Sequence, residues 1–371
     1  MLCLNVESIR IINFRNYSDL FLKLNKRINI FVGKNAQGKT NLLEAIYICA
    51  TGKSFRTNRD KQLINLTKNE AYIGSKIKVG KNEKLIEVKL DNNSSKRIKI
   101  NKIELKNFKE LDSGLNVVVF SPDDLNLVKG GPAERRSFLD MSISQIRPVY
   151  RHNINRYNKI LFQRNNLLKS NKSKSDIINL LGIFDLQLVK IGTDIITSRI
   201  EYVDKLFKIA SKVHNNLTLK KEYLILNYAS NVEFNNKNKN DIEKNFLEQL
   251  NLNKDKDIYT GITSIGPHRD DIQIKINNID ARTFGSQGQQ RTIVLSLKLS
   301  EVEIIKIEKG AYPVLLLDDV FSELDIDRRK YLTKSFNNMQ TIITSTETIK
   351  SKEFDKIDKS VFYIDNGRII K

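Results

Sequence analysis

The chain has 371 residues, of which 40% are hydrophobic and 29% charged, a composition typical of folded proteins and unlike that of disordered or fibrous chains. Its formal net charge of +20 favours a polyanionic partner such as nucleic acid, although lysine and asparagine are frequent along the whole sequence and general composition accounts for part of the excess. No uncharged apolar stretch approaches the roughly 18–20 residues needed to cross a bilayer, and Glu7 and Arg10 stand where a signal peptide requires an apolar core.

The two cysteines, Cys3 and Cys49, lie in apolar segments and lack metal-ligand spacing. We expect both to be buried as small apolar side chains in a reducing compartment. This expectation agrees with a cytoplasmic protein that has no membrane partner.

The first third of the sequence has the pattern of β-structure. Alternating apolar residues over 4–12 and an apolar run over 28–32 predict strands. Between residues 71 and 103, short runs with a period of two are separated by turn residues, which predicts an antiparallel meander with lysines on its solvated face. Another strand is predicted over 116–120.

The pattern changes after Pro122. From about residue 132 to 216, apolar residues recur at spacings of three and four, which predicts long amphipathic helices, and the polar run 170–175 predicts the turn between two of them. Strand patterns return at 223–227 and 271–276.

The last third contains a predicted helix over 288–309 that ends at Gly310, and a buried strand over 313–317. We therefore expect a helical arm inserted between two halves of one core.

The strongest motif is a phosphate-binding loop between the strand at 28–32 and an apolar helix at 42–49. It fits G-x-x-x-x-G-K-[ST], in which glycines let backbone N–H groups and the helix N-terminus point at phosphate oxygens. Lys39 is expected to reach the β- and γ-phosphates of ATP, and Thr40 to ligate Mg²⁺. The loop consists of Gly33, Lys34, Asn35, Ala36, Gln37, Gly38, Lys39 and Thr40.

A second motif is the apolar strand over 313–317, which is followed by Asp318 and Asp319. Nucleotide hydrolysis requires one carboxylate at the end of such a strand to hold Mg²⁺ and a neighbour to orient the attacking water. Asp318 fits the first role and Asp319 the second. The alternative is that the two aspartates are solvated and only cap the strand. The presence of the phosphate-binding loop favours the catalytic interpretation over this alternative.

The third motif is a Gly-Ser loop that enters the helix over 288–309. Ser286, Gly288 and Gln289 resemble the signature of ABC ATPases, which addresses the γ-phosphate of a nucleotide held by the other subunit of a homodimer. Residues 322–325 resemble the D-loop that links the two sites. The catalytic set is then Lys39, Asp319 and Ser286.

Further motifs make the whole chain similar to the RecF family. Phe14, Arg15, Asn16 and Tyr17 resemble the opening motif of that family, in which the arginine lies near the nucleotide. The other motifs follow in family order at residues 52–57, 120–125, 130–140, 163–165 and 266–271.

The resemblance implies an α/β fold, namely an ABC-type, SMC-like P-loop ATPase head with an inserted helical arm. Residues 1–125 would form the N-terminal ATPase part, 126–260 the arm and 261–371 the C-terminal ATPase part. The family resemblance also implies a protein that dimerises on ATP, binds DNA gaps and junctions at the nucleoid, and hydrolyses ATP weakly under DNA stimulation. It would act with RecO and RecR in recombinational repair and replication-fork maintenance.

Two other classes share parts of this pattern. An ABC transporter subunit also has a switch histidine, a Q-loop glutamine and a shorter helical insert. Here residues 341–346 contain no histidine, so that either Ser345 or Thr346 serves or the switch role is absent. Residues 121–124 occupy the Q-loop neighbourhood without a glutamine. Both departures predict slow hydrolysis. An ATPase head fused to a nuclease, as in overcoming-lysogenisation proteins, needs an acidic Toprim segment after the ATPase, and the sequence ends soon after Gly367.

Three residues near these motifs have weaker patterns. His268 follows Gly-Pro in a predicted loop, which favours a hydrogen-bonded structural histidine over a catalytic one. Arg135 and Arg136 near the start of the arm could contact DNA, although an arginine pair on a helix is more often simply solvated.

Overall fold

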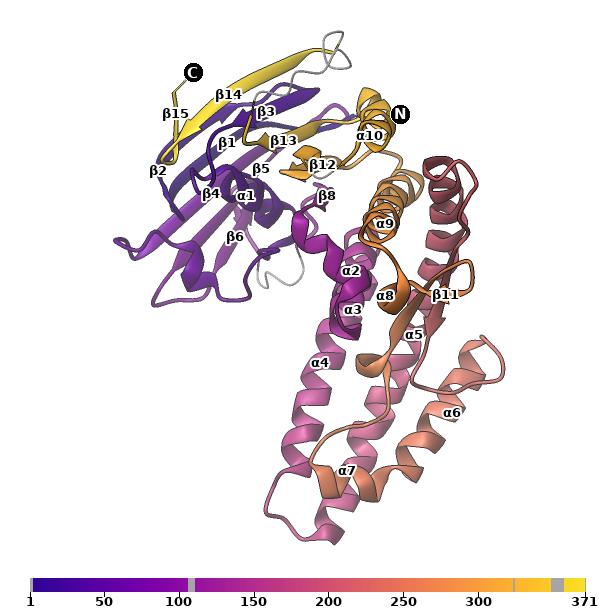
Figure 1. The fold of residues 1–371 in the computed structure, drawn as a ribbon. Coiled ribbons are helices and arrows are strands. Elements are labelled where there is room, and N and C mark those ends of the chain that lie inside the picture. Colours follow the sequence, from indigo (N-terminus) through magenta and orange to yellow (C-terminus); the bar gives the residue numbers. More distant parts are fainter. Residues whose placement is uncertain (1–2, 106–110, 323, 348–356, 371) are drawn as a thin grey trace. The chain divides into compact units, whose positions relative to one another are not determined.

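The chain divides into two compact units. The computed structural model describes residues 3–105, 111–322, 324–347 and 357–370. The first unit comprises Met1–Asp124 and Lys298–Lys371, and the second, Leu125–Leu297, is inserted between them (Figure 1). The sequence division placed residues 261–297 with the C-terminal ATPase part, whereas the structure groups them with the helical unit.

The first unit contains a six-stranded sheet in the order β15-β14-β3-β13-β12-β8. All neighbours in it are parallel except β14 and β15. Its central strands β3, β12 and β13 are buried almost throughout, as expected for parallel strands covered on both faces. The strands are β3 (Ile28–Val32), β8 (Val117–Phe120), β12 (Val314–Asp318), β13 (Thr341–Ser345), β14 (Lys359–Asp365) and β15 (Arg368–Ile369).

A second, antiparallel sheet of the same unit has the order β2-β1-β4-β5-β6-β7. Helix α1 (Lys39–Thr51) contacts strands of both sheets, so that nearly all of its side chains are buried. This arrangement fixes the start of α1 beside the carboxyl ends of the parallel strands. The strands are β1 (Leu4–Phe14), β2 (Tyr17–Lys23), β4 (Glu70–Val79), β5 (Asn82–Asp91), β6 (Arg97–Ile100) and β7 (Ile103–Glu104).

Shorter helices complete the first unit. Helix α10 (Ile326–Ser335) is preceded by Asp325, whose side chain accepts a hydrogen bond from the Arg328 N–H and so caps the first turn. The 3₁₀ helices are η1 (Asp60–Leu63), η3 (Pro122–Leu125), η5 (Val320–Ser322) and η6 (Phe336–Asn338), of which η3 reaches into the second unit.

The second unit is built on two long helices that lie side by side, α4 (Pro148–Leu168) and α5 (Lys174–Leu217) (Figure 1). Ser173 caps α5 by accepting from the Asp176 N–H, so that the predicted polar run forms the turn between the helices. Apolar residues of α5 and α6 form a core cluster with Val232. The other helices are α2 (Asn126–Lys129), α3 (Pro132–Ile146), α6 (Lys239–Leu252), α7 (Lys254–Thr260), η4 (Pro267–Arg269) and α8 (Ala281–Phe284).

A three-stranded antiparallel sheet, in the order β11-β10-β9, belongs to the second unit. Helix α9 (Gln287–Lys309) begins in the second unit and continues into the first, and Gly310 follows it with φ +70, as predicted for a C′ glycine. The strands are β9 (Leu224–Ala229), β10 (Asp271–Ile276) and β11 (Ile279–Asp280).

One expectation about the core was wrong. Cys49 is buried in α1, but Cys3 is exposed, because it precedes β1 instead of lying within it. In the part of the chain that the structure describes, no helix is long and apolar enough to cross a membrane.

Candidate nucleotide site

The phosphate-binding loop connects β3 to α1 in a conformation that requires glycine. Gly38 has φ +110 and Ala36 φ +64, both in the left-handed region that favours glycine. A Cβ at Gly33 would lie 2.4 Å from the Ile364 carbonyl oxygen, so the chain has no room for a side chain there. Gly38 caps α1 without a side chain, which leaves the first N–H groups of the helix directed at the loop.

Two hairpins hold the loop from outside. The Asn16 amide donates to the Gln37 carbonyl oxygen at 2.9 Å, and the Tyr17 hydroxyl donates to the Gly38 carbonyl oxygen at 3.0 Å. From the β14–β15 turn, the Gly367 N–H donates to the Gln37 carbonyl oxygen at 2.9 Å. Asn16 and Tyr17 belong to the opening motif at residues 14–17, but the sequence alone predicted no role for either residue.

Lys39 lies inside the loop. Its ammonium group donates to the carbonyl oxygens of Gly33 at 2.6 Å and Lys34 at 2.9 Å. Burial lowers the pKa of Lys39, while the charges of Asp319 and Asp318 raise it. The amine is therefore held by the loop within electrostatic reach of the two acids, and its contact with β- and γ-phosphates stays a prediction.

Asp318 ends the buried strand β12 and contacts two hydroxyl groups. The Thr40 hydroxyl lies 2.8 and 2.9 Å from its two carboxylate oxygens, and the Thr344 hydroxyl donates to Oδ1 at 2.8 Å. Burial raises the pKa of Asp318, and the bonds from Thr344 and Thr40 act in the opposite direction. The structure thus brings together Thr40 and Asp318, the two predicted Mg²⁺ ligands.

Asp319 has φ +55, a left-handed backbone conformation that is uncommon for residues other than glycine. Such conformations recur at functional sites. Its N–H donates to the Thr344 hydroxyl oxygen at 2.9 Å. The turn at Asp319 re-aims the chain directly after Asp318, so that the two neighbouring carboxylates do not point to opposite faces of a continuing strand.

Thr344 is the residue that sequence reasoning missed. It pairs with Asp318 in the parallel register of β12 and β13, and the predicted switch candidates do not take that place. The Ser345 hydroxyl donates to the Glu347 carbonyl oxygen at 2.6 Å, and Thr346 is exposed. The sequence signal for this role is a residue with a hydroxyl group near the end of β13, the strand that pairs with β12.

Arg15 lies behind the loop in an ion pair. Its guanidinium donates to both carboxylate oxygens of Glu44, at 2.9 and 2.8 Å, and Glu44 is fully buried in α1. The Ser54 hydroxyl donates to the same carboxylate at 2.5 Å, and Arg56 lies 3.6 Å from it. These contacts tie the Arg15 side chain to α1. Its contact with nucleotide stays a prediction.

The segment predicted to occupy the Q-loop neighbourhood follows β8, directly beside β12. Asp124 accepts from the Ser121 N–H at 2.7 Å and lies 3.0 Å from the buried Lys298 ammonium of α9. Neighbouring charges of Asp124 and Glu301 raise the pKa of Lys298, although burial lowers it. This ion pair joins α9 to the sheet of the first unit.

The signature-like loop lies at the start of α9 in the second unit. The Ser286 hydroxyl accepts from the Gln289 N–H at 3.2 Å, and the Gln289 side-chain oxygen accepts from the Ser286 N–H at 2.8 Å. This reciprocal pair is a capping box. Ser286 is exposed and Gly288 half-buried. Nucleotide contacts of Ser286, Gly288 and Gln289 stay predictions.

The D-loop prediction is covered in part. Glu323 lies outside the described residues, whereas Leu324 is buried and Asp325 caps α10. A role of this segment between two sites stays a prediction.

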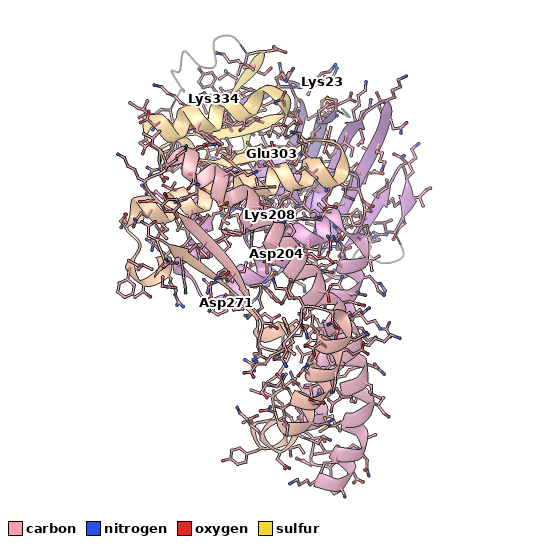
Figure 2. All side chains as sticks on the ribbon, turned by 90° about the vertical axis from the view of Figure 1, so that its right-hand side faces the viewer. Lys23, Asp204, Lys208, Asp271, Glu303 and Lys334 are labelled. Carbon is pink, nitrogen blue, oxygen red and sulfur yellow. The ribbon has the colours of Figure 1, made fainter. Side chains whose placement is uncertain are left out.

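The other candidates are structural. His268 accepts from the Tyr157 hydroxyl at Nδ1, 2.8 Å away, and donates from Nε2 to the Thr263 carbonyl oxygen at 3.0 Å. Burial lowers the pKa of His268 to about 4, so the ring is neutral at pH 7. Arg135 is buried and donates to both carboxylate oxygens of Asp271, which Figure 2 labels; it is not available to DNA.

The donor set at Thr40 and Asp318 fits Mg²⁺ bound with nucleotide. Mg²⁺ prefers oxygen ligands and is usually held by one or two protein groups together with phosphates and water. Among the described residues, no group of three or more His, Cys, Asp or Glu side chains is placed to hold a metal ion alone. Thr40 and Asp318 would supply only part of the coordination shell of Mg²⁺, and phosphate and water oxygens would complete it.

Known proteins resemble this chain over its whole length. The RecF/RecN/SMC N terminal domain family matches residues 5–369. The DNA replication and repair protein RecF of Alkaliphilus oremlandii is 47% identical over 98% of this chain and 99% of its own, and that of Clostridium tetani is 43% identical over 99% of each. The RecF-ATPrS structure of the recombination mediator protein in the RecFOR pathway superposes with a TM-score of 0.90 at 36% identity, over 99% of this chain and 97% of that chain.

An Smc head domain from Pyrococcus furiosus shares the fold, with a TM-score of 0.56 at 14% identity over 99% of this chain and 95% of that chain. These relationships favour the DNA-repair branch of the ABC ATPases over a transporter subunit. The chain belongs to the RecF family of DNA replication and repair proteins, with the SMC-like ATPase fold.

Proposed function

We propose that this protein is an ATP-gated DNA-binding protein, in which bound ATP closes a homodimer on DNA and slow hydrolysis opens it. The observation that carries the proposal is the convergence of Lys39, Thr40, Asp318 and Asp319 at the carboxyl edge of one parallel sheet. This is the place where open α/β sheets bind their ligands.

The nucleotide chemistry follows from these groups. Lys39 and the N–H groups at the start of α1 hold the phosphates, and Thr40 and Asp318 hold Mg²⁺, which when bound neutralises charge on the phosphate oxygens. Asp319 orients the attacking water and takes up its proton. The Thr344 hydroxyl donates to the Asp318 carboxylate and accepts from the backbone N–H of Asp319. A hydroxyl in place of a switch histidine supports slow turnover.

A dimer is required for the signature to act. Ser286 is exposed at the N-terminus of the 23-residue helix α9, where a hydroxyl and the helix dipole favour an anion. We assign that anion to the γ-phosphate of a nucleotide held by a second copy. RecF-ATPrS and RecF-ATP structures of a relative support nucleotide binding in this fold.

DNA and the recombination partners follow from the family. The relatives are DNA replication and repair proteins, and the solved RecF structures belong to the RecFOR pathway, which supports RecO and RecR as partners at DNA gaps. The net charge of +20 suits a phosphate backbone. We place the protein in the cytoplasm at the nucleoid, where that DNA lies, and expect DNA to stimulate its ATPase activity.

Ser286→Arg tests the composite site, because it places a bulky cation in the closed dimer. The variant should bind ATP with wild-type affinity, yet neither form the ATP-dependent dimer nor hydrolyse ATP, and its DNA binding in ATP should fall. ATP affinity, mass by light scattering and turnover are measured on the same preparation. Lys39→Ala is the control that loses ATP binding itself. Normal dimerisation and turnover of Ser286→Arg would overturn the composite site.

The DNA part of the proposal has its own test. Affinity for gapped DNA should depend on ATP and fall steeply with salt, by about 0.9 in log–log slope for each neutralised duplex phosphate. Binding that is independent of both ATP and salt would contradict an ATP-gated clamp.

A further inference from the structure

The side-chain amide of Gln289 makes two hydrogen bonds within the second unit. Its oxygen accepts from the Ser286 N–H at 2.8 Å, and its amide nitrogen donates to Oε1 of Glu222 at 2.9 Å. An amide offers one acceptor and one donor group in fixed opposition. The Glu222 contact therefore fixes which face of the amide meets Ser286.

Glu222 connects this amide to a buried histidine. While Oε1 of Glu222 accepts from Gln289, its other oxygen, Oε2, lies 3.3 Å from Nε2 of His214. The two oxygens are thus held by different elements. Glu222 itself is only 23% exposed, so water competes weakly for its carboxylate.

His214 lies beside this carboxylate, at the end of α5. The residue is fully buried in the last turn of α5, and its Nδ1 lies 3.3 Å from the Ser296 hydroxyl of α9. The Ser296 hydroxyl donates to the Thr292 carbonyl oxygen at 2.7 Å within α9. The end of α5 and the first turns of α9 are therefore joined through one polar chain. Earlier turns of α5 carry Asp204 and Lys208, which Figure 2 labels.

We propose that Glu222 is a positioning residue of the signature loop, which fixes Gln289 and through it Ser286 for contact with nucleotide on a second copy. Gln289 then acts through Ser286, whose N–H donates to its amide oxygen. The inference rests on the proposed function of Ser286 in a composite site.

Glu222 lies in the chain between the end of α5 and β9, and its two carboxylate oxygens face His214 of α5 and Gln289 of α9.

A double-mutant cycle tests the proposal on the full-length protein. Glu222→Ala should weaken ATP-dependent dimerisation about tenfold, the scale of one hydrogen bond to a charged group, and leave ATP affinity of the monomer unchanged. Gln289→Ala should have a similar effect. In the Gln289→Ala background, Glu222→Ala should then change little, because the two residues act as one unit.

Two further variants separate positioning from general stability. Glu222→Gln retains an oxygen that can accept from Gln289 and should recover most of the dimerisation. Glu201→Gln is the matched control, because it removes an ion pair with Arg147 in the same unit, at 2.7 Å and with Glu201 52% exposed, without touching the loop. It should dimerise as wild type does.

Hydrogen exchange measures the stability of the signature loop independently of activity. The Ser286 and Gln289 N–H groups, which the capping box protects, should exchange about tenfold faster in Glu222→Ala and unchanged in Glu201→Gln. Additive effects in the cycle, or unchanged exchange at both N–H groups, would overturn the positioning role. If Ser286→Arg dimerises normally, the composite site is wrong, and the exchange rates still decide whether Glu222 holds the loop.

Discussion

The Thr40 hydroxyl lies 2.8 and 2.9 Å from the two carboxylate oxygens of Asp318, although the residues are 278 positions apart in the chain. Thr40 stands in the first turn of α1 and Asp318 at the end of β12. Strand β13 lies between β12 and β3, which leads into the phosphate-binding loop. The contact therefore depends on the parallel order of these three strands.

Asp318→Asn is expected to weaken Mg²⁺-dependent ATP binding at least about tenfold, because a carboxamide is a poorer ligand for a hard cation. Burial raises the pKa of Asp318, so the charge that the substitution removes is one that burial disfavours. ATP titrations with Mg²⁺ and with EDTA check the prediction. The variant and the wild type should bind Mg²⁺-free ATP equally, and an unaltered Mg²⁺ effect would remove Asp318 from the metal site.

Asp319→Asn is expected to retain ATP while its hydrolysis slows by about 10²–10⁴-fold, the usual contribution of a positioned general base. The amide has the same shape, so the turn at Asp319 is preserved. Single-turnover hydrolysis of bound ATP measures the chemical step directly. Wild-type turnover in both this variant and Asp318→Asn would mean that the acids only cap β12.

Local patterns predicted much of this site because its groups lie at the start of α1 and at the end of β12. Lys39, Thr40, Asp318 and Asp319 were placed from short motifs, and the fold of the head followed from their order. The role of Thr344 was not predicted, since it depends on its register opposite Asp318 in a neighbouring strand. A single sequence contains no signal for such register.

Thr344→Val should slow hydrolysis more than it weakens ATP binding. The substitution keeps the shape of the side chain but removes the hydroxyl that donates to Asp318 and accepts from the Asp319 N–H. The Asp318 carboxylate and the partly buried Asp319 N–H both lose this partner, and a typical hydrogen bond contributes about 0.5–1.5 kcal/mol to the unfolding free energy. Ser345→Ala is the neighbouring control, because its hydroxyl bonds to Glu347. Equal turnover of the two variants would contradict a role for Thr344.

The buried charges of the arm were also beyond sequence reasoning. Periodicity predicted the long helices and the turn between them, but a helical pattern does not show which charged residues face inward. Arg164 and Arg199 are almost fully buried, and their acidic partners come from distant parts of the chain. Arg164 belongs to the family motif at residues 163–165. In the structure it forms buried ion pairs inside the arm.

His268 should make the stability of the protein depend on pH below neutrality. Burial lowers its pKa from 6.5 to about 4, so the unfolded chain takes up a proton first as the pH falls. The stabilisation by the neutral ring is complete above pH 6.5 and is lost between pH 6.5 and 4. Wild type should lose about 2 kcal/mol more than His268→Gln between pH 7 and 5 in urea titrations. Parallel pH profiles would contradict the neutral, buried histidine.

Arg164 should be required for the arm because it neutralises two buried acids. Its guanidinium donates to Asp185 at 2.7 Å and to Asp257 at 2.8 Å, and all three side chains are at most 2% exposed. Arg164→Met leaves two carboxylates buried without their cation, which should destabilise the arm by about 3–5 kcal/mol.

Burial already raises the pKa of Asp185, so replacing both acids with neutral residues should relieve this cost. Adding Asp185→Asn and Asp257→Asn to Arg164→Met is therefore expected to restore most of the unfolding free energy, measured by urea denaturation. Arg147→Met is the control, since its partner Glu201 is 52% exposed and such a pair contributes less than about 1 kcal/mol. If Arg164→Met and the triple variant are equally unstable, the loss comes from packing of the arginine side chain and not from uncompensated charge.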